Sequence, residues 1–157
     1  MDTTASTGTD QLSFTRIDNE QDFPTWAPRT SIEDFLLTNM KPYNDPPRDI
    51  TAALDYCFSK DGKPGGYIML AHFGNQLAGV CVMLNSGMGG FIPKWILLYI
   101  GVNPEIRGKG IGGKLMKESI DQCDGDVKLH VEYQNPAKRL YERFGFTTKY
   151  AEMRYTR

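Results

Sequence analysis

The chain has 157 residues, of which 40% are hydrophobic and 24% are charged, and its formal net charge is -1. This length and composition suit one globular domain with a sizeable core, and the small net charge excludes a general attraction to nucleic acid or to a membrane surface. The three cysteines are far apart and lack C-x-x-C spacing, which argues against a disulfide framework and a zinc site.

Residues 1–11 are rich in Thr and Ser and predict a disordered tail, followed by a single domain over residues 12–157. The tail lacks the basic and apolar regions of a secretory signal, and no apolar run approaches the roughly eighteen residues of a membrane span. We therefore expect a cytoplasmic protein. His72 and His130 are the only histidines and have no evident carboxylate partners, so no metal is expected.

The N-terminal third predicts one strand and two helices. Alternating residues favour a strand over residues 12–17. Ser31 and Asp34 form a loose capping box that would open a helix ending near Met40. A second helix is indicated by an apolar face repeating over residues 50–58.

The middle of the chain predicts strands. Two β-rich runs, at residues 67–73 and 77–84, flank a turn at residues 74–76 and indicate an antiparallel hairpin. Residues 95–102 form the most apolar run and suit a central strand.

The remaining chain predicts an alternation of helices and strands. The pattern indicates an amphipathic helix at residues 111–123, a strand at 127–131, a short helix between Asn135 and Gly145, and closing strands at 146–150 and 153–157. The expected fold is an α/β sandwich with a mixed sheet of six or seven strands and helices on both faces.

The stretch Arg107-Gly108-Lys109-Gly110-Ile111-Gly112 lies between the apolar strand and the amphipathic helix. Glycines let the backbone approach an anion closely, and a helix that begins here directs unpaired N–H groups and its positive dipole end at the same point. Basic residues at positions 107, 109, 114 and 117 add positive charge. The stretch therefore predicts a site for a ligand that carries a pyrophosphate.

One pattern that fits this stretch is the dinucleotide fingerprint G-x-G-x-x-G. Gly108, Gly110 and Gly113 match it, and Glu132 lies near the expected acidic position. However, five residues separate the strand from Gly108, and only twenty-five residues follow Glu132. That remainder is too short for a dinucleotide-binding sheet, so a nicotinamide oxidoreductase is the weaker alternative.

The other pattern is Arg-x-x-Gly-x-Gly, met by Arg107, Gly110 and Gly112. Together with the upstream strand and the segment at residues 135–146, it resembles the GNAT superfamily of acyl-CoA N-acyltransferases over roughly residues 66–150. The resemblance implies the same α/β fold and an acetyltransferase that moves an acetyl group from acetyl-CoA to a primary amine by direct attack. It does not identify the amine or the acyl-chain preference.

The resemblance also implies which residues bind coenzyme A. They are Ile100 and Val102 through their main chain, the glycine-rich stretch with Arg107, Gly108, Lys109, Gly110, Ile111, Gly112 and Gly113, and Asn135. The side chains of Ile100 and Val102 also fit an ordinary core, and Asn135 also fits a helix N-cap. The commoner family spacing would place Gln134, rather than Asn135, at the ligand.

Tyr141 corresponds to the family tyrosine that protonates the coenzyme A thiolate, although its place on an apolar helix face also fits a core residue. The strand at residues 95–102 carries no carboxylate, so the general base is left open among His130, Glu132 and Tyr99. The cysteines are not expected to act as nucleophiles.

By analogy, loops at residues 42–47 and 85–93 would flank the amine acceptor, with Tyr43, Met88 and Tyr99 as lining residues. Their Gly and Pro content also fits plain connectors. The missing strand carboxylate keeps open a coenzyme A-binding sensor without catalysis. The sequence leaves a homodimer open and does not determine the oligomeric state.

Overall fold

Five strands form one sheet in the order β1-β2-β3-β4-β5 in the computed structural model, which describes residues 11–106 and 108–157. They are β1 (Leu12–Ile17), β2 (Gly66–Phe73), β3 (Gln76–Asn85), β4 (Trp95–Val102) and β5 (Val127–Lys128). β1 to β4 pair antiparallel, and β5 is parallel to β4. This order differs from the parallel, doubly wound sheet of a dinucleotide-binding fold.

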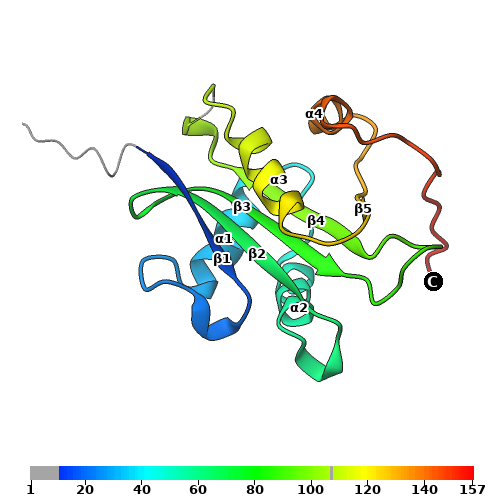
Figure 1. Cartoon of the computed structure of the whole chain (residues 1–157), viewed down its shortest axis with the longest axis horizontal. Coiled ribbons are helices and arrows are strands. Elements are labelled where there is room, and N and C mark those ends of the chain that lie inside the picture. The colour runs from blue at the N-terminus through cyan, green and yellow to red at the C-terminus, as the bar shows by residue number, and fades with distance from the viewer. Residues whose placement is uncertain (1–10, 107) are drawn as a thin grey trace, which may run out of the picture.

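Helices lie on both faces of the sheet, as predicted (Figure 1). α1 (Arg29–Asn39) and α2 (Pro47–Cys57) cover one face, whereas α3 (Ile111–Asp121) and α4 (Ala137–Phe144) lie on the other. Short 3-10 turns occupy Glu20–Asp22, Lys60–Gly62 and Pro104–Ile106. In the described residues, no helix has both the length and the apolarity that crossing a membrane requires.

The sheet separates two apolar clusters because successive side chains of a strand point to opposite faces. The cluster under α1 and α2 contains Ile68, Leu70, Val80 and Val82 from the sheet. The cluster under α3 and α4 contains Met69, Cys81, Met83, Leu115 and Met116. Both faces of β2 and β3 are covered, which explains why their sequences are continuous apolar runs.

β4 breaks this alternation at Leu98. The register steps from Val82 opposite Tyr99 to Met83 opposite Leu97, so Leu98 is the extra residue of a β-bulge. Leu98 and Tyr99, although adjacent in sequence, therefore both pack against the cluster under α1 and α2. The bulge is what turns the Tyr99 side chain toward α1 and α2.

The predicted strands near the C-terminus are wrong. β5 ends at Lys128 rather than at residue 131, and no strand follows α4 in the described part of the chain, which gives five strands instead of six or seven. A strand needs a partner edge and a face to bury. β5 offers an edge of two residues, and Tyr150, Met153 and Tyr155 are 77 to 91% exposed in the segment that follows α4.

The start of α1 also differs from the prediction. The helix begins at Arg29, one turn before the expected start, and Ser31 donates a hydrogen bond from Oγ to the Pro28 carbonyl (2.7 Å) instead of capping the helix with Asp34. Arg29 explains the earlier start, because its guanidinium pairs with Glu33 (2.8 Å) on α1 and with Asp55 (2.8 Å) on α2. The tertiary ion pairs thus extend the helix.

Candidate functional site

The first turn of α3 presents unpaired backbone N–H groups. Gly110 is the N-cap residue with φ 68°, and Gly108 has φ 88°, a region that glycine enters without steric cost. The first helical hydrogen bond runs from the Lys114 N–H to the Gly110 carbonyl (3.1 Å). The N–H groups of residues 111–113 therefore have no partner within the helix, and no acidic residue lies in this turn.

The first turn of α3 packs beside two neighbouring elements. A Cβ on Gly112 would be 3.6 Å from Leu140 of α4 and 3.7 Å from Val102 at the end of β4. The Ile111 side chain is buried in the cluster beneath α3, so only its main chain faces the loop. The N-terminus of α3 is thus held between the end of β4 and the middle of α4.

The basic side chains near this turn do not all converge on it. Lys109 Nζ lies 5.4 Å from the ring centre of Phe73, and Lys117 Nζ pairs with Asp121 Oδ2 at 2.6 Å. The predicted contribution of Arg107 lies outside the described residues. Among the predicted loop residues, the clearest anion-binding feature is the helix backbone.

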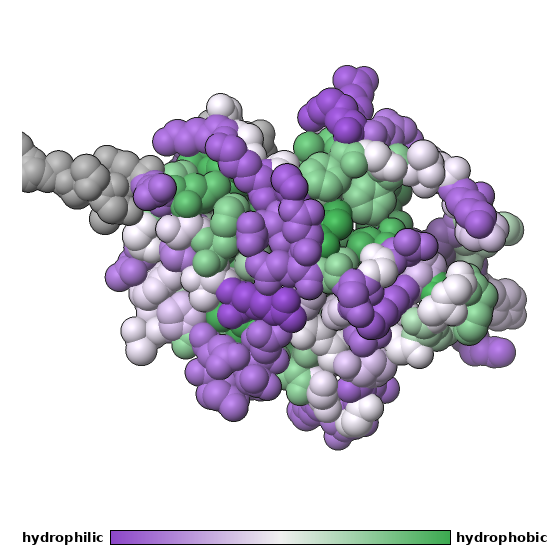
Figure 2. Space-filling model, viewed as in Figure 1, coloured by the Kyte–Doolittle hydropathy of each residue, from purple (hydrophilic) through white to green (hydrophobic). Residues whose placement is uncertain are grey.

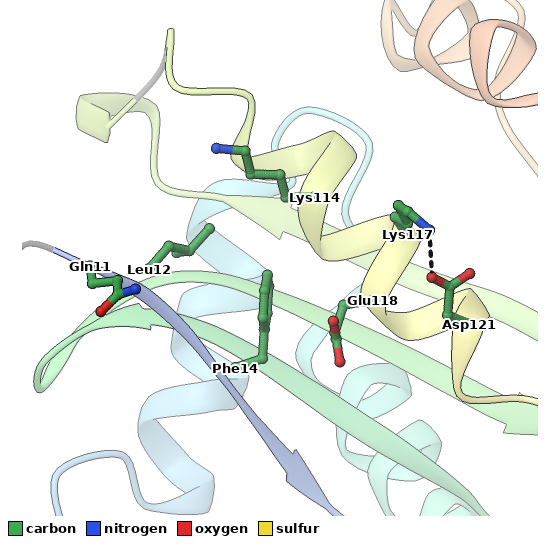
Figure 3. A pocket seen from close by; sticks show the side chains of 7 residues that line it. All are labelled: Gln11, Leu12, Phe14, Lys114, Lys117, Glu118 and Asp121. Atoms are coloured by element: carbon green, nitrogen blue, oxygen red, sulfur yellow. Dashed lines mark hydrogen bonds and ion pairs between the residues drawn. The ribbon is translucent and has the colours of Figure 1, made fainter.

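A separate groove of about 450 Å³ lies between β1 and α3 (Figure 3). Its lining is Gln11, Leu12, Phe14, Lys114, Lys117, Glu118 and Asp121. Leu12 and Phe14 point from β1 toward α3, which contributes two lysines and two carboxylates. These charges balance, and the groove lies along the side of α3 instead of at its N-terminal loop, so we do not assign the predicted pyrophosphate to it.

β4 and β5 separate soon after they meet. Among the described residues, their pairing covers only Trp95 with Val127 and Ile96 with Lys128, and no strand lies on that side of β4 from residue 97 to Val102. We call the space beside residues 97–102 of β4 the β4–β5 opening. Apolar surface gathers between α3 and α4, above these strands (Figure 2). Main-chain groups of β4 in the β4–β5 opening are thereby left without a ladder partner.

Tyr141 lies on the α3 and α4 side of the sheet, on the buried face of α4. Its side chain is 8% exposed and makes an edge contact with Phe146, with ring centres 6.0 Å apart. Burial, with a smaller contribution from Cys81, raises the pKa of Tyr141 to about 12. Tyr141 and Cys81 belong to the same buried cluster, and Cys81 pairs in register with Ile100 of β4.

The segment between β5 and α4 holds Gln134 and Asn135. The Asn135 Oδ1 accepts a hydrogen bond from the Ala137 N–H (2.9 Å), but α4 begins at Ala137 with Pro136 as its N-cap residue, one position later than the predicted N-cap at Asn135. The Gln134 carbonyl accepts a hydrogen bond from the Tyr43 hydroxyl (3.2 Å). Gln134 thus links this segment to the loop between α1 and α2.

His130 and Glu132 lie just beyond the end of β5, and both are exposed. In the described residues neither side chain takes part in a hydrogen bond or an ion pair. Because the strand ends at Lys128, neither residue is fixed by sheet pairing. No three His, Cys, Asp or Glu side chains of the described residues are grouped closely enough to hold a metal ion.

Tyr99 contacts a carboxylate that the sequence analysis missed. Its hydroxyl donates a hydrogen bond to Asp45 Oδ2 at 2.6 Å. Burial, followed by the hydrogen bond to Asp45, raises the pKa of Tyr99 above its ordinary value, which disfavours the deprotonated phenol. The two residues are 54 positions apart, and the only local signal was an aspartate in a proline-rich loop.

The other predicted acceptor residues lie at two different places. Tyr43 is half-buried in the loop between α1 and α2. Met88 is 45% exposed in the connection between β3 and β4, which leads into Trp95 and so lies at the opposite end of β4 from the glycine-rich loop. The structure thus groups Tyr43 and Tyr99 around one loop and leaves Met88 apart.

Known structures share this architecture. An aminoglycoside N-acetyltransferase solved in complex with CoA superposes with a TM-score of 0.63 at 13% identity, over 94% of this chain and 95% of that chain. A ribosomal-protein-alanine N-acetyltransferase from Brucella melitensis biovar Abortus 2308 superposes with a TM-score of 0.66 at 13% identity, over 93% and 99% of the two chains. At these identities the likeness shows the fold.

Sequence comparison adds a local match and a family match. The Cysteine-rich protein 2-binding protein of Homo sapiens is 44% identical over 52 residues, which are 32% of this chain and 7% of that protein. The chain therefore spans only a small part of the curated relatives that it matches. The model of the acetyltransferase (GNAT) family matches residues 17–146, most of the chain. Because this match covers most of the chain, including the predicted glycine-rich loop, the chain belongs to the GNAT acetyltransferase family.

Proposed function

We propose that the protein transfers an acetyl group from acetyl-CoA to a primary amine by direct attack in a ternary complex. The observation that carries the proposal is the coincidence of two features at one place. The unpaired N–H groups at the start of α3 lie beside the end of β4, where β4 has lost its strand partner. A long ligand with a pyrophosphate and an amide-bearing arm matches both features.

The pyrophosphate would bind the loop from Arg107 to Gly113. The N–H groups of Ile111, Gly112 and Gly113, together with the helix dipole, favour an anion there, and the left-handed Gly108 and Gly110 let the backbone approach it. Lys109 adds charge, although its ammonium lies over Phe73 in this structure. The absence of an acidic residue from the first helical turn leaves the positive helix end available to the ligand.

The pantetheine arm would lie in the β4–β5 opening. Amide groups of the arm can pair with the main chain of Ile100 and Val102, in place of the strand that is missing there. Their side chains pack partly in the cluster under α3, so the role that we assign to them is that of the backbone. Asn135 or Gln134, on the facing segment, would contact the coenzyme from the other side.

The reaction requires an uncharged amine, an electrophilic thioester and a proton for the sulfur. The ammonium first loses a proton to a base, for which we retain His130 and Glu132 as alternatives. The amine nitrogen then attacks the thioester carbonyl, the C–S bond breaks, and the nitrogen loses its second proton as the amide forms. The sulfur leaves with the electron pair and gains one proton, so one proton is released per turnover.

We assign Tyr141 as the general acid. With a pKa of about 12 it is fully protonated at neutral pH and can donate a hydrogen bond to the departing sulfur. A thiolate in the same buried place also becomes more basic, because desolvation disfavours its charge. The difference between the pKa of the thiol and that of the Tyr141 phenol therefore becomes smaller. The hydroxyl has no hydrogen-bond partner in the described residues, which leaves it available to a ligand.

Direct attack fits the state of the cysteines. Burial raises the pKa of Cys57 and of Cys81 to about 12, and burial also raises that of the half-buried Cys123. Thiols in this state are poor nucleophiles, so a covalent acyl-enzyme has no evident carrier. The amine would approach along the loop that carries Tyr43, past Tyr99, with Met88 as a more distant lining residue.

A coenzyme A-binding sensor without catalysis is the second candidate. The observation that favours it is the lack of a fixed base: β4 carries no carboxylate, and His130 and Glu132 are exposed beyond the end of β5. A sensor would keep the loop and the β4–β5 opening but would not turn over.

Thermal unfolding tests the proposal first. The protein is heated alone and with acetyl-CoA, coenzyme A or NAD, because a ligand that binds the native state raises the unfolding midpoint. We expect a shift with both coenzyme A compounds and none with NAD. Release of free thiol in the presence of primary amines then separates the enzyme from the sensor, and no shift with either coenzyme A compound would reject both.

A further inference from the structure

The loop between α1 and α2, residues 40–46, contacts both sides of the β4–β5 opening. Toward β4, Asp45 accepts a hydrogen bond from Tyr99 (2.6 Å), and Met40 lies 3.3 Å from the position of a Cβ on Gly101. Toward the segment before α4, the Tyr43 hydroxyl donates to the Gln134 carbonyl (3.2 Å). The loop therefore crosses the β4–β5 opening on the side of α1 and α2, opposite to α3 and Tyr141.

Asp45 is held at this crossing. The bulge at Leu98 turns Tyr99 toward α1 and α2, and the Tyr99 ring is 5% exposed, so its hydroxyl has a fixed position. That hydroxyl binds Oδ2 of an otherwise exposed carboxylate. A surface aspartate is usually mobile, whereas this one is anchored to the central strand by a buried phenol.

The charge of Asp45 is not balanced by a neighbouring side chain. In the described part of the chain Asp45 forms no ion pair, whereas the nearby Asp49 has a basic neighbour, with Arg48 Nε at 3.8 Å. The second carboxylate oxygen and the remaining lone pairs of Oδ2 are therefore available to a ligand. A positively charged group is the ligand chemistry that an anchored, exposed carboxylate selects.

We propose that Asp45 binds a cationic group of the acceptor, so that the preferred substrates are amines carrying a second positive charge. This inference rests on the proposed function, since it concerns the acceptor end of the same site. One ammonium would be held by Asp45 while the second amine, uncharged, reaches the thioester within the β4–β5 opening. Tyr99 is then a positioning residue, which acts through Asp45.

The test compares two acceptors of equal length, 1,4-diaminobutane and 4-amino-1-butanol, which differ in one ammonium. Their kcat/KM values are measured for the wild type, for Asp45→Asn and for Asp49→Asn. We expect the wild type to prefer the diamine. Asp45→Asn should lower kcat/KM for the diamine by about tenfold to a hundredfold, mainly through KM, as loss of a hydrogen bond to a charged group predicts.

The matched measurements distinguish a specific role of Asp45 in binding the second charge from a general loss of activity. With Asp45→Asn, kcat/KM for the amino alcohol should stay within about twofold of the wild type. The free energy of such a change is smaller than that of a typical hydrogen bond to a charged group. Asp49→Asn removes the same charge four positions later, in the first turn of α2, and should leave the preference unchanged. Tyr99→Phe should weaken the preference in the same direction as Asp45→Asn, because the carboxylate loses its anchor. An equal loss for both acceptors in Asp45→Asn would overturn the proposal.

Calorimetry on the coenzyme A-loaded protein gives a second readout that does not require turnover. The wild type should bind the diamine more tightly than the amino alcohol, and Asp45→Asn should bind both alike. No difference in the wild type would overturn the inference about Asp45. The thermal shift with coenzyme A decides the proposed function separately, so the two failures can be told apart.

Discussion

Leu115 of α3 lies directly over Gly79 of β3: its Cδ2 atom is 2.9 Å from the place that a Cβ on Gly79 would take. The Gly101 carbonyl of β4 is 3.3 Å from the same place. The absence of a side chain at residue 79 therefore sets how closely α3 packs on the sheet. Since the N-terminus of α3 is the proposed pyrophosphate site, this contact positions that site from below.

Gly79→Ala should destabilise the protein because the added methyl overpacks the contact with Leu115 and the Gly101 carbonyl. We expect a loss of about 1–3 kcal/mol in the free energy of unfolding. Denaturant titration measures the loss. Gly89→Ala is the matched control, since a Cβ on Gly89 meets nothing within 4 Å. Equal effects of the two substitutions would show that packing at Gly79 does not matter.

Gly110→Ala should weaken coenzyme A binding by about tenfold, because the left-handed N-cap conformation costs an L-residue about 1–2 kcal/mol and the loop would relax away from it. Isothermal titration calorimetry measures the Kd. Gly90 also has a positive φ and open space around it, but it lies in the connection between β3 and β4. Gly90→Ala should therefore cost similar stability and leave the Kd unchanged, and a change in both would indicate a general loss of folding.

Tyr141→Phe should lower kcat by about a hundredfold, the usual contribution of a general acid, while coenzyme A binding is retained. The ring still fills the cluster under α4, so folding should be preserved. Tyr150→Phe is the control, since Tyr150 is 77% exposed. Because the pKa of Tyr141 is raised to about 12, the wild type should show no alkaline loss of kcat from this group between pH 7 and about 10. Unchanged kcat in Tyr141→Phe would exclude the acid role.

Asp55→Asn should destabilise the protein at neutral pH by about 1–2 kcal/mol, because the carboxylate joins α2 to Arg29 of α1. The hydrogen bond from Arg29 holds the pKa of Asp55 below its usual value in the folded state. Its contribution is therefore full above the unfolded pKa of about 4 and is lost as the pH falls through the folded pKa.

Urea titrations at neutral and acidic pH check this sign. The difference between wild type and Asp55→Asn should shrink on acidification. Asp34→Asn, on the exposed side of α1, should show little effect at either pH, since Asp34 forms no ion pair in the described residues. A difference that grows at low pH would contradict the assigned direction.

Much of the fold followed from short-range patterns. The first four strands and all four helices lie within a few residues of their predicted places, because alternation, apolar helical faces and glycine breaks are local signals. The closing strands did not follow. The segments 146–150 and 153–157 contain aromatic and Thr residues that favour strands, but strand formation depends on a partner edge, and β5 presents two residues.

Local sequence was sufficient for the glycine-rich turn, since a positive φ at Gly110 and the free N–H groups of a helix start are properties of the chain itself. Which side chains meet was decided by the tertiary structure. The bulge at Leu98 brings Tyr99 to Asp45 across 54 positions, and Lys117 turns to Asp121 instead of the loop. Such contacts depend on strand register and helix packing, which no short stretch of sequence specifies.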